Sequence, residues 1–366
     1  MGNFSGFVAG QARRDDGWRD FSPSTLYNGF ADFGWDAETG GVHVKLVGAD
    51  TDLTGNGTAP VELLDADYSA VFTHPDNTQN RFVRGSVHPW IAVGDAGRIE
   101  ATLYAQSFRQ RTLNGDAADI EACSADATLL CVSDASDNEA VLRDALGAAI
   151  ADTLGGEGYG ALNRSRTKTR SAGVLAQYVT QRNLAGMAHN IAIGFSHDRS
   201  TTRFAASSEL GELTDDRSVE GLGSIITQPD GSIAPVELDV TTRQTGLFFA
   251  DTVKLTQRLS AEIGLRWNHT YVDLRDQIGT ALNGTHRFRR LNPGVEFDYA
   301  LTDHLSLRGG YAETSRAPTP AELSCADEAA PCSLTNFFVG DPPLEQVVGK
   351  SWEAGASGKL SGSWTG

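Results

Sequence analysis

The stretch "LSAEIGLRWNHTYVDL", residues 259–274, alternates between two kinds of side chain. Most of its bulky apolar residues fall on odd positions, namely Leu259, Ala261, Ile263, Leu265, Trp267 and Tyr271. Its even positions are mainly polar or small, namely Ser260, Glu262, Gly264, Arg266, Asn268 and Thr270. Because successive side chains of a strand point to opposite faces, this pattern predicts a strand with one apolar and one hydrated face. The alternation lasts about twice as long as a typical globular strand.

The same two-residue rhythm recurs along the whole chain. It predicts twelve strands, at residues 3–14, 24–36, 42–53, 80–93, 98–111, 169–184, 188–203, 239–255, 259–275, 285–300, 304–315 and 348–364. The phase is least clear in 24–36 and 169–184. Long alternating segments therefore occur throughout the chain, which is predicted to be all-β.

The connections between these strands alternate between short and long. The short ones are the turns "AETGG", "GDAG", "AGM", "TQR" and "TDH". The long ones run through residues 15–23, 54–79, 112–168, 204–238, 276–284 and 316–347. A soluble sandwich or propeller has no reason to place every long loop at one end, whereas an outer-membrane barrel does. In hydrocarbon an unpaired strand edge is costly, so such strands must close into a barrel. We therefore expect an antiparallel transmembrane β-barrel with long extracellular loops.

Composition limits the other classes. The chain has 366 residues, of which 21% are charged, and its net charge of -17 argues against nucleic-acid binding. No run of apolar residues is long enough for a transmembrane helix, but barrel strands need only every second residue to be apolar. A soluble secreted β-sandwich or propeller stays open as a weaker alternative.

Side chains of the predicted strands fit a membrane barrel. Aromatic residues near strand ends suit the girdles at the membrane interfaces, although ordinary sandwich packing explains any one of them: Trp35, Trp90, Phe204 and Trp267. Polar residues on the other face would line the lumen: Glu262, Arg266, Arg308 and Glu353. We expect the apolar face to contact outer-membrane lipid.

One long loop carries a helical pattern. In "SDNEAVLRDALGAAIADTLGG", residues 136–156, Ser136 and Glu139 have the spacing of a capping box, and Gly155 can end a helix. Apolar residues follow at helical spacing: Val141, Leu142, Leu146, Ala149 and Ile150. We predict one short amphipathic helix here. The loop around it, 112–168, is acidic. Its acids could simply be solvated, or they could attract cationic ligands or divalent ions.

Four cysteines form two local pairs, Cys123 with Cys131 and Cys325 with Cys332. These spacings favour two small disulfide loops in an oxidising compartment, while a four-cysteine zinc site would require CxxC-like knuckles that the chain lacks. The chain begins "MGNFSGFVAG", without the features of a secretory signal, and ends within an alternating pattern. We therefore expect a fragment of a longer protein.

Signatures of catalysis are missing from the sequence. The His residues show no HExxH spacing, no P-loop or GxSxG elbow occurs, and "GGEGYG" at 155–160 does not follow a strand of a βαβ unit. We expect no enzyme activity, no cofactor and no metal site.

The last third of the chain resembles TonB-dependent outer-membrane receptors. "LFFADTVKLTQRLSAEIGLRW" looks like a strand–turn–strand signature of that family, and "YAETSRAPTPAEL" at 311–323 is similar to another of its motifs. The positions that match the second motif are Arg316, Ala317, Pro318, Thr319, Glu322 and Leu323. In "VGDPPLEQVVGKSWEAG", the matching positions are Asp341, Pro342, Leu344, Ser351, Trp352, Glu353 and Gly355. This segment departs from the family at Glu345, Gln346 and Val347, where Lys-Pro-Glu is usual.

Earlier segments resemble the siderophore-type branch of the same family. They are "DDGWRDFSPS", "LTGNGTAPVELL" and "VFTHPDNTQNRF". The resemblance implies a barrel of about 22 strands closed by an N-terminal plug. Residues 1–366 would supply about twelve of these strands, without the plug that carries the TonB box. The implied partners of the whole protein are the TonB complex and a ferric siderophore, and its implied location is the bacterial outer membrane.

Three residues are candidates for contact with the ligand. Arg109, Arg111 and Asn114 lie where a predicted strand enters the long loop 112–168. They could face an anionic chelate, or the arginines could instead pair with acids of the same loop. The motif around Arg316 is expected to anchor a loop rather than touch ligand. A passive porin-like or adhesive outer-membrane barrel is the alternative to an active receptor.

Overall fold

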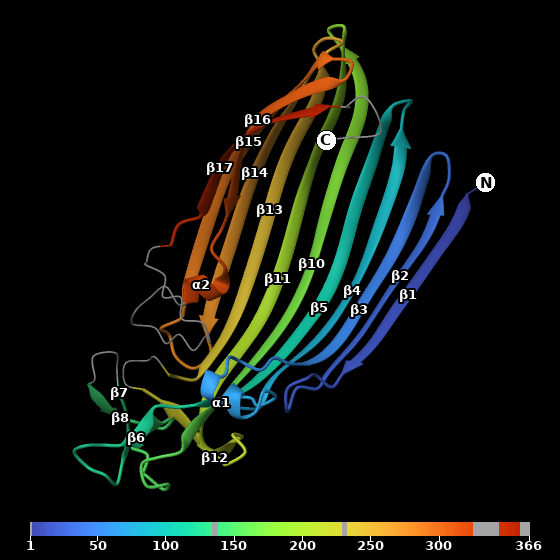
Figure 1. The fold of residues 1–366 in the computed structure, drawn as a ribbon. Helices are drawn as coiled ribbons and strands as arrows, with labels where there is room; N and C mark the ends of the chain where they lie inside the picture. Colours follow the sequence, from blue (N-terminus) through green and yellow to red (C-terminus); the bar gives the residue numbers. More distant parts are fainter. Residues whose placement is uncertain (1, 134–137, 229–232, 325–343, 359–366) are drawn as a thin grey trace.

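A computed structural model describes residues 2–133, 138–228, 233–324 and 344–358. Its main element is one antiparallel sheet in which neighbours along the chain are neighbours in space (Figure 1). The twelve strands in sheet order are β1 (Asn3–Asp15), β2 (Ser24–Asp36), β3 (Gly40–Thr54), β4 (Asp76–Val93), β5 (Gly97–Ala117), β10 (Tyr159–Leu184), β11 (Met187–Leu213), β13 (Val236–Lys254), β14 (Leu259–Asp276), β15 (Gly284–Thr302), β16 (Leu305–Arg316) and β17 (Val347–Gly358). The all-β, antiparallel prediction is confirmed, and within the described residues the sheet is open, with β1 and β17 at its edges.

Short and long connections lie at opposite ends of the sheet, as predicted (Figure 1). A two-residue turn joins β10 to β11 through Ala185 and Gly186, whose φ angles are 50° and 80°. Two successive positive φ values are those of a type I′ turn, which matches the right-handed twist of the strands. β10 and β11 are 26 and 27 residues long, so parts of the predicted loops 112–168 and 204–238 belong to strands instead.

Smaller elements gather at the long-loop end (Figure 1). They are α1 (Val61–Ala66), β6 (Ile120–Ala122), β7 (Leu130–Ser133), β8 (Glu139–Val141), β9 (Arg143–Asp144), β12 (Val219–Thr227) and α2 (Pro320–Ser324). Neither helix, in the part of the chain that the structure describes, has the length and apolarity needed to cross a membrane.

The two faces of the sheet differ in chemistry. Cross-strand register aligns Ile91, Ile99, Tyr178, Ile193, Phe249, Leu265 and Pro293 in one row. We call the side that carries this row the apolar face. Its large side chains are open to the surroundings, with Ile193 53% and Leu265 41% exposed. Soluble proteins seldom expose so long a row of large apolar residues.

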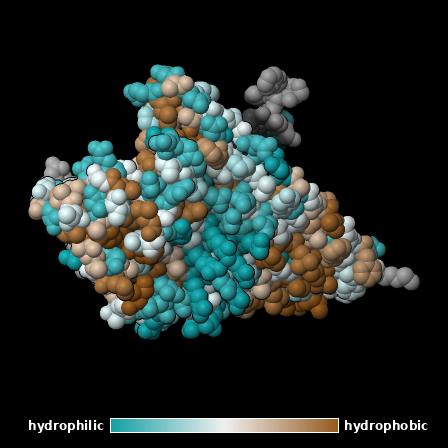
Figure 2. Space-filling view, turned by 90° about the horizontal axis from the view of Figure 1, so that it is seen from below, coloured by the Kyte–Doolittle hydropathy of each residue, from teal (hydrophilic) through white to brown (hydrophobic). Residues whose placement is uncertain are grey.

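The opposite side, the polar face, has a matching row. Glu100, Gln177, Gly194, Phe248 and Arg266 are neighbours across five strands. Seen from the loop end, hydrophilic and hydrophobic surface occupies separate areas (Figure 2). One strand therefore serves two environments, because its side chains alternate between them.

Some residues depart from this division. His189 and Asp251 lie on the apolar face near the short turns and bind each other, with 2.7 Å between Nδ1 and Oδ2. Trp90 and Phe204, predicted for the membrane girdles, lie on the polar face. The Trp90 ring donates to Asp36, and Phe204 packs on a cluster that includes Leu238. An aromatic residue near a strand end thus does not by itself identify the face.

The predicted helix at 136–156 is wrong for the described residues. Glu139–Val141 and Arg143–Asp144 are short strands, and Asp144 Oδ1 accepts the backbone N–H of Leu146 and Ala148 in a tight turn. Leu142 is fully buried whereas Leu146 is 93% exposed, so the apolar residues do not share a helical face. Pairing of Val141 with Cys131 replaces the helical hydrogen bonds. The two helices found among the described residues lie in other loops.

Candidate functional site

The polar face is tied together by side chains that reach across intervening strands. Tyr104 of β5 donates its hydroxyl to Asp198 of β11 at 2.5 Å, passing over β10. The β10 residue opposite both is Gly173, where a Cβ would collide with both side chains. A glycine inside a strand often marks such a close approach. The contact across three strands therefore depends on the missing side chain of Gly173.

A second crossing repeats this arrangement. Arg266 of β14 donates to Ser196 Oγ of β11 at 3.2 Å, over Gly246 of β13. The guanidinium also donates to Asn268 at 2.9 Å. Here too a Cβ on Gly246 would crowd the guanidinium and the hydroxyl. The polar face is thus a continuous wall of hydrogen-bonded groups rather than a set of isolated polar residues.

Nearer the short turns, His43 connects two carboxylates. Its Nδ1 and Nε2 each lie 3.0 Å from a carboxylate oxygen, of Asp32 and Asp36 respectively. The indole N–H of Trp90 donates to the other oxygen of Asp36 at 2.7 Å. With both ring nitrogens in contact with acids, a protonated imidazole would donate to both. This part of the wall is polar, and both of its acids are hydrogen-bonded.

Toward the loop end, the polar face becomes apolar and buried. Val272 and Leu274 break the odd-position pattern of their strand, and both are at most 2% exposed. They belong to a cluster with Val236, Leu238, Val240, Leu282 and Leu323. Because Leu323 belongs to α2, the loop after β16 packs onto the same cluster as β13 and β14. A buried apolar cluster therefore covers the loop end of the polar face.

An ion pair holds that loop in shape. Arg316 makes two hydrogen bonds to Glu322, both of 2.9 Å, and the Thr319 N–H donates to Glu322 Oε2 at 2.6 Å. These hydrogen bonds lower the pKa of the Glu322 carboxyl to about 2, since they favour its ionised form. Pro318, between the partners, is buried. Arg316, Pro318, Thr319 and Glu322 of the family motif thus lie together around α2.

The other motif residues lie in the edge strand β17. Trp352 packs its ring against Tyr311, with 4.5 Å between centroids, on the apolar face. Glu353 lies opposite Gly310 and Gly355 opposite Arg308. These three residues are therefore positions of the sheet itself.

The three predicted ligand residues do not converge. Arg109 and Arg111 share the parity of Ile99 in β5, so they lie on the apolar face. Asn114 lies on the polar face, opposite Asp76 and Asn163. The odd numbering of the two arginines within the predicted strand 98–111 already carried this information. For Asn114 the numbering could be used only once β5 was known to continue to Ala117.

The long loop after β5 folds on its own core. Leu130, Leu142 and Ile226 are completely buried there, and other members of the cluster are Ile120, Val132, Tyr159 and Leu210. The core joins the loop strands to the ends of β10, β11 and β12. Tyr159 donates its hydroxyl to Asp152 at 2.6 Å and accepts the N–H of Thr153 and Leu154.

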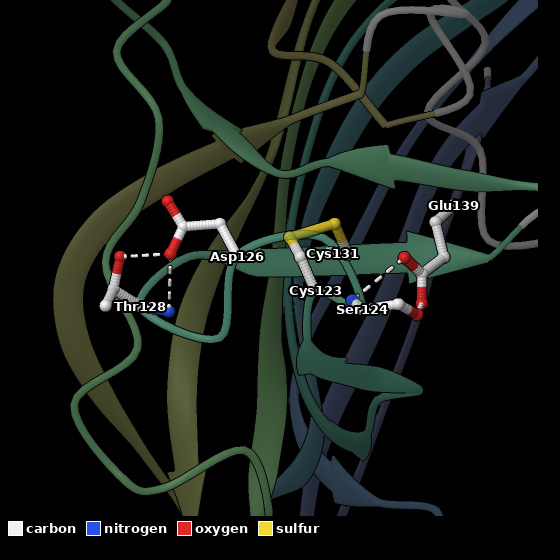
Figure 3. Close-up of a disulfide and its surroundings, with 6 residues drawn as sticks. All are labelled: Cys123, Ser124, Asp126, Thr128, Cys131 and Glu139. Atoms are coloured by element: carbon white, nitrogen blue, oxygen red, sulfur yellow. Dashed lines mark hydrogen bonds between the residues drawn. A yellow bond between two sulfur atoms is a disulfide. The ribbon is translucent and has the colours of Figure 1, made fainter.

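A disulfide closes the tip of this loop between Cys123 and Cys131, as predicted (Figure 3). Beside it the Ser124 N–H donates to Glu139 at 3.0 Å, and Asp126 accepts the N–H and hydroxyl of Thr128. A closed loop of this length stabilises by about 2–3 kcal/mol in the chain-entropy account. The second predicted pair, Cys325 and Cys332, lies outside the described residues.

Within the described ranges, no group of three or more His, Cys, Asp or Glu side chains is arranged to hold a metal ion. The crossings over Gly173 and Gly246 were missed in the sequence. Glycines that interrupt otherwise alternating strands were the signal that could have found them. The hydrogen-bonded polar face suits binding and passage.

Comparison with known proteins agrees with this geometry. The family model "TonB dependent receptor-like, beta-barrel" matches residues 3–366. No curated protein matches by sequence. Solved structures of several transporters and receptors share the fold. The unliganded ferric citrate transporter FecA is 12% identical, with a TM-score of 0.69, and the match covers 99% of this chain and 45% of FecA.

Two further structures are described as a ferric-catecholate import receptor and a siderophore receptor. The ferric-catecholate import receptor Fiu of E. coli K12, in its closed form, is 11% identical with a TM-score of 0.68, covering 99% of this chain and 52% of Fiu. The siderophore receptor PiuA of Acinetobacter baumannii is 10% identical with a TM-score of 0.66, covering 98% and 51%. The chain thus spans about half the length of these proteins. Its matched family consists of transporters, not enzymes, and the chain belongs to the TonB-dependent receptor-like β-barrel family.

Proposed function

We propose that the whole protein is an outer-membrane receptor for active, TonB-dependent uptake of a ferric siderophore or a similar scarce nutrient. The observation that carries this proposal is the division of one sheet into an exposed apolar face and a hydrogen-bonded polar face, in a chain of this family. A barrel wall needs lipid-compatible side chains outside and hydrated ones inside.

The polar face and the loop end would have different tasks. The wall around Tyr104, Asp198 and Arg266 would line the lumen, where its groups stay hydrated or contact a plug. The ligand would bind at the extracellular mouth, among the long loops. The plug and the TonB box are expected outside residues 1–366, so this segment alone would not transport.

The proposed class of ligand is taken from the descriptions of the similar solved structures. The descriptions of FecA, PiuA and Fiu name ferric citrate, a siderophore and ferric catecholate, whereas OprC, 14% identical with a TM-score of 0.60, is described as a copper transporter. Iron chelates are therefore the first candidates, and copper is the comparison to include.

Deletion of the complete gene tests the proposal. We expect loss of radiolabelled ferric-chelate uptake and poor growth under iron limitation, with recovery when the full-length gene is restored. Uptake should also stop when TonB is removed. Unchanged iron uptake after deletion would contradict the proposal, and uptake that persists without TonB would indicate a passive porin. A parallel measurement with copper distinguishes the two metals.

A further inference from the structure

A group of five cations lies on the apolar face, toward the loop end. Arg109 and Arg111 of β5 belong to it, with Arg166, Lys168 and Arg170 of β10. We call these residues the basic cluster. Arg109 lies directly opposite Lys168, and Arg111 directly opposite Arg166. All five have the parity of Ile99 and Tyr178, so their side chains leave the sheet on the same side as the apolar row.

This arrangement is unfavourable without a partner. Like charges directly opposite in an antiparallel pair destabilise a sheet. In the described ranges, none of the five side chains lies within ion-pair distance of a carboxylate. Two of the nearby acids are engaged by other cations: Asp50 pairs with Arg81 at 2.8 Å, and Asp239 pairs with Arg203 at 3.2 Å.

Repulsion is concentrated on one residue. Four neighbouring arginines act electrostatically on Lys168, three of which belong to the cluster. The fourth, Arg203, lies opposite Lys168 in β11. An external anion would relieve this repulsion and would gain charge-assisted hydrogen bonds to several donors at once.

The depth of the cluster identifies the kind of anion. Along β5, the outward residues Ile99, Ala101, Leu103 and Ala105 are apolar and Arg109 follows four residues after the last of them. Four residues advance about 13 Å along a strand, or about 9 Å along the membrane normal at a tilt near 45°. That height corresponds to the headgroup layer just above the hydrocarbon.

The surface between the cations is grooved. One groove of about 360 Å³ is lined by Arg109, Arg111, Arg166, Lys168 and Arg203, with Glu237 as its acid. A second, of about 280 Å³, continues beside Arg109 and Arg111 toward β3 and β4. The grooves have room for phosphate groups, and the apolar row below them has room for acyl chains.

We propose that the basic cluster binds the phosphate groups of an anionic, multiply acylated lipid in the outer leaflet. The inference rests on the proposed function for its membrane location. Charge complementarity supplies the headgroup contacts, and continuity with the apolar row supplies the chain contacts. A free phosphate ion would use only the first, and the transported ligand would meet the opposite, polar face.

The test uses the full-length protein in neutral-detergent micelles, with lipid A as the probe and bound copies counted by native mass spectrometry. The variant carries Arg109→Gln, Arg111→Gln and Lys168→Gln. The control carries Arg182→Gln, Lys254→Gln and Arg258→Gln, which removes the same charge at the short-turn end. Heat-modifiable migration on gels confirms that all three proteins are folded.

We expect the cluster variant to bind lipid A on the order of 100-fold more weakly, about fivefold for each cation, and the control to bind normally. Inorganic phosphate should compete only at much higher concentration, since it lacks acyl chains. Equal lipid binding by wild type and cluster variant, or an equal loss in the control, would overturn the proposal. Ferric-chelate binding by the same samples separates failure of this inference from failure of the proposed function.

Discussion

The sheet and the loop after β5 treat apolar side chains in opposite ways. On the sheet, large residues such as Ile193 and Leu265 are exposed on one face. In the loop, Leu130, Leu142 and Ile226 are completely buried around a small core. The loop therefore folds as a water-soluble unit does, by burying its apolar side chains away from water. The strands place that surface where hydrocarbon would take the place of water.

The largest effect is expected where this comparison is sharpest, in the loop core. Leu142→Ala removes a fully buried side chain and should destabilise the loop by about 2–5 kcal/mol, because a cavity stays behind. Hydrogen exchange of the Leu130 amide, which is bonded to the Ile150 carbonyl, reports the opening of this core. Leu146→Ala is the control: Leu146 lies four residues after Leu142 but is 93% exposed, so its truncation should have almost no effect. Equal effects of the two substitutions would show that the loop has no packed core.

The second-largest loss of stability is expected from a charge introduced on the apolar face. Leu265→Arg places a cation in the row that would contact lipid, which should cost about 2–4 kcal/mol of folding free energy in a bilayer. Thr270→Arg is the control, since Thr270 lies on the polar face of the same strand. The measurement is the free energy of unfolding in lipid vesicles. If both variants lost stability equally, the assignment of the two faces would be wrong.

The rhythm of the strands could be predicted because it is local. A strand with different surroundings on its two sides must alternate, so segments such as 259–275 reveal both their structure and their apolar face. The pairing of consecutive strands then follows from the short turns. The loop could not be predicted in this way, because Leu142 and Ile150 satisfy a helical spacing as well as they satisfy a ladder with Leu130. Only tertiary pairing decides between the two.

The candidate site was harder to predict than the fold. Arg109, Arg111 and Asn114 are close in sequence, yet parity sends the arginines and the asparagine to opposite faces. The crossings over Gly173 and Gly246 join strands far apart in the sequence, and they follow from register rather than from any motif. By contrast, Arg316, Thr319 and Glu322 interact within one short segment, and their motif could be recognised from the sequence.

That short segment joins the two regions, because α2 covers the loop end of the polar face through Leu323. Glu322 has its pKa lowered to about 2 from an ordinary 4.5, chiefly by the hydrogen bond from Arg316. A carboxyl with a lowered pKa stabilises the folded state above its unfolded pKa, and that contribution is lost as the pH falls from about 4.5 to about 2.

We therefore expect the loop around α2 to open more readily as the pH falls through this range. Glu322→Gln should remove most of that pH dependence. Both partners are more than one-third exposed, so the pair should contribute no more than about 1 kcal/mol. The opening can be followed by hydrogen exchange of the Leu323 amide, which donates to the Thr319 carbonyl at 3.0 Å, after correction for the intrinsic exchange rate. A variant with the same pH dependence as wild type would assign it to other carboxylates, and the loop would then be held by Leu323 alone.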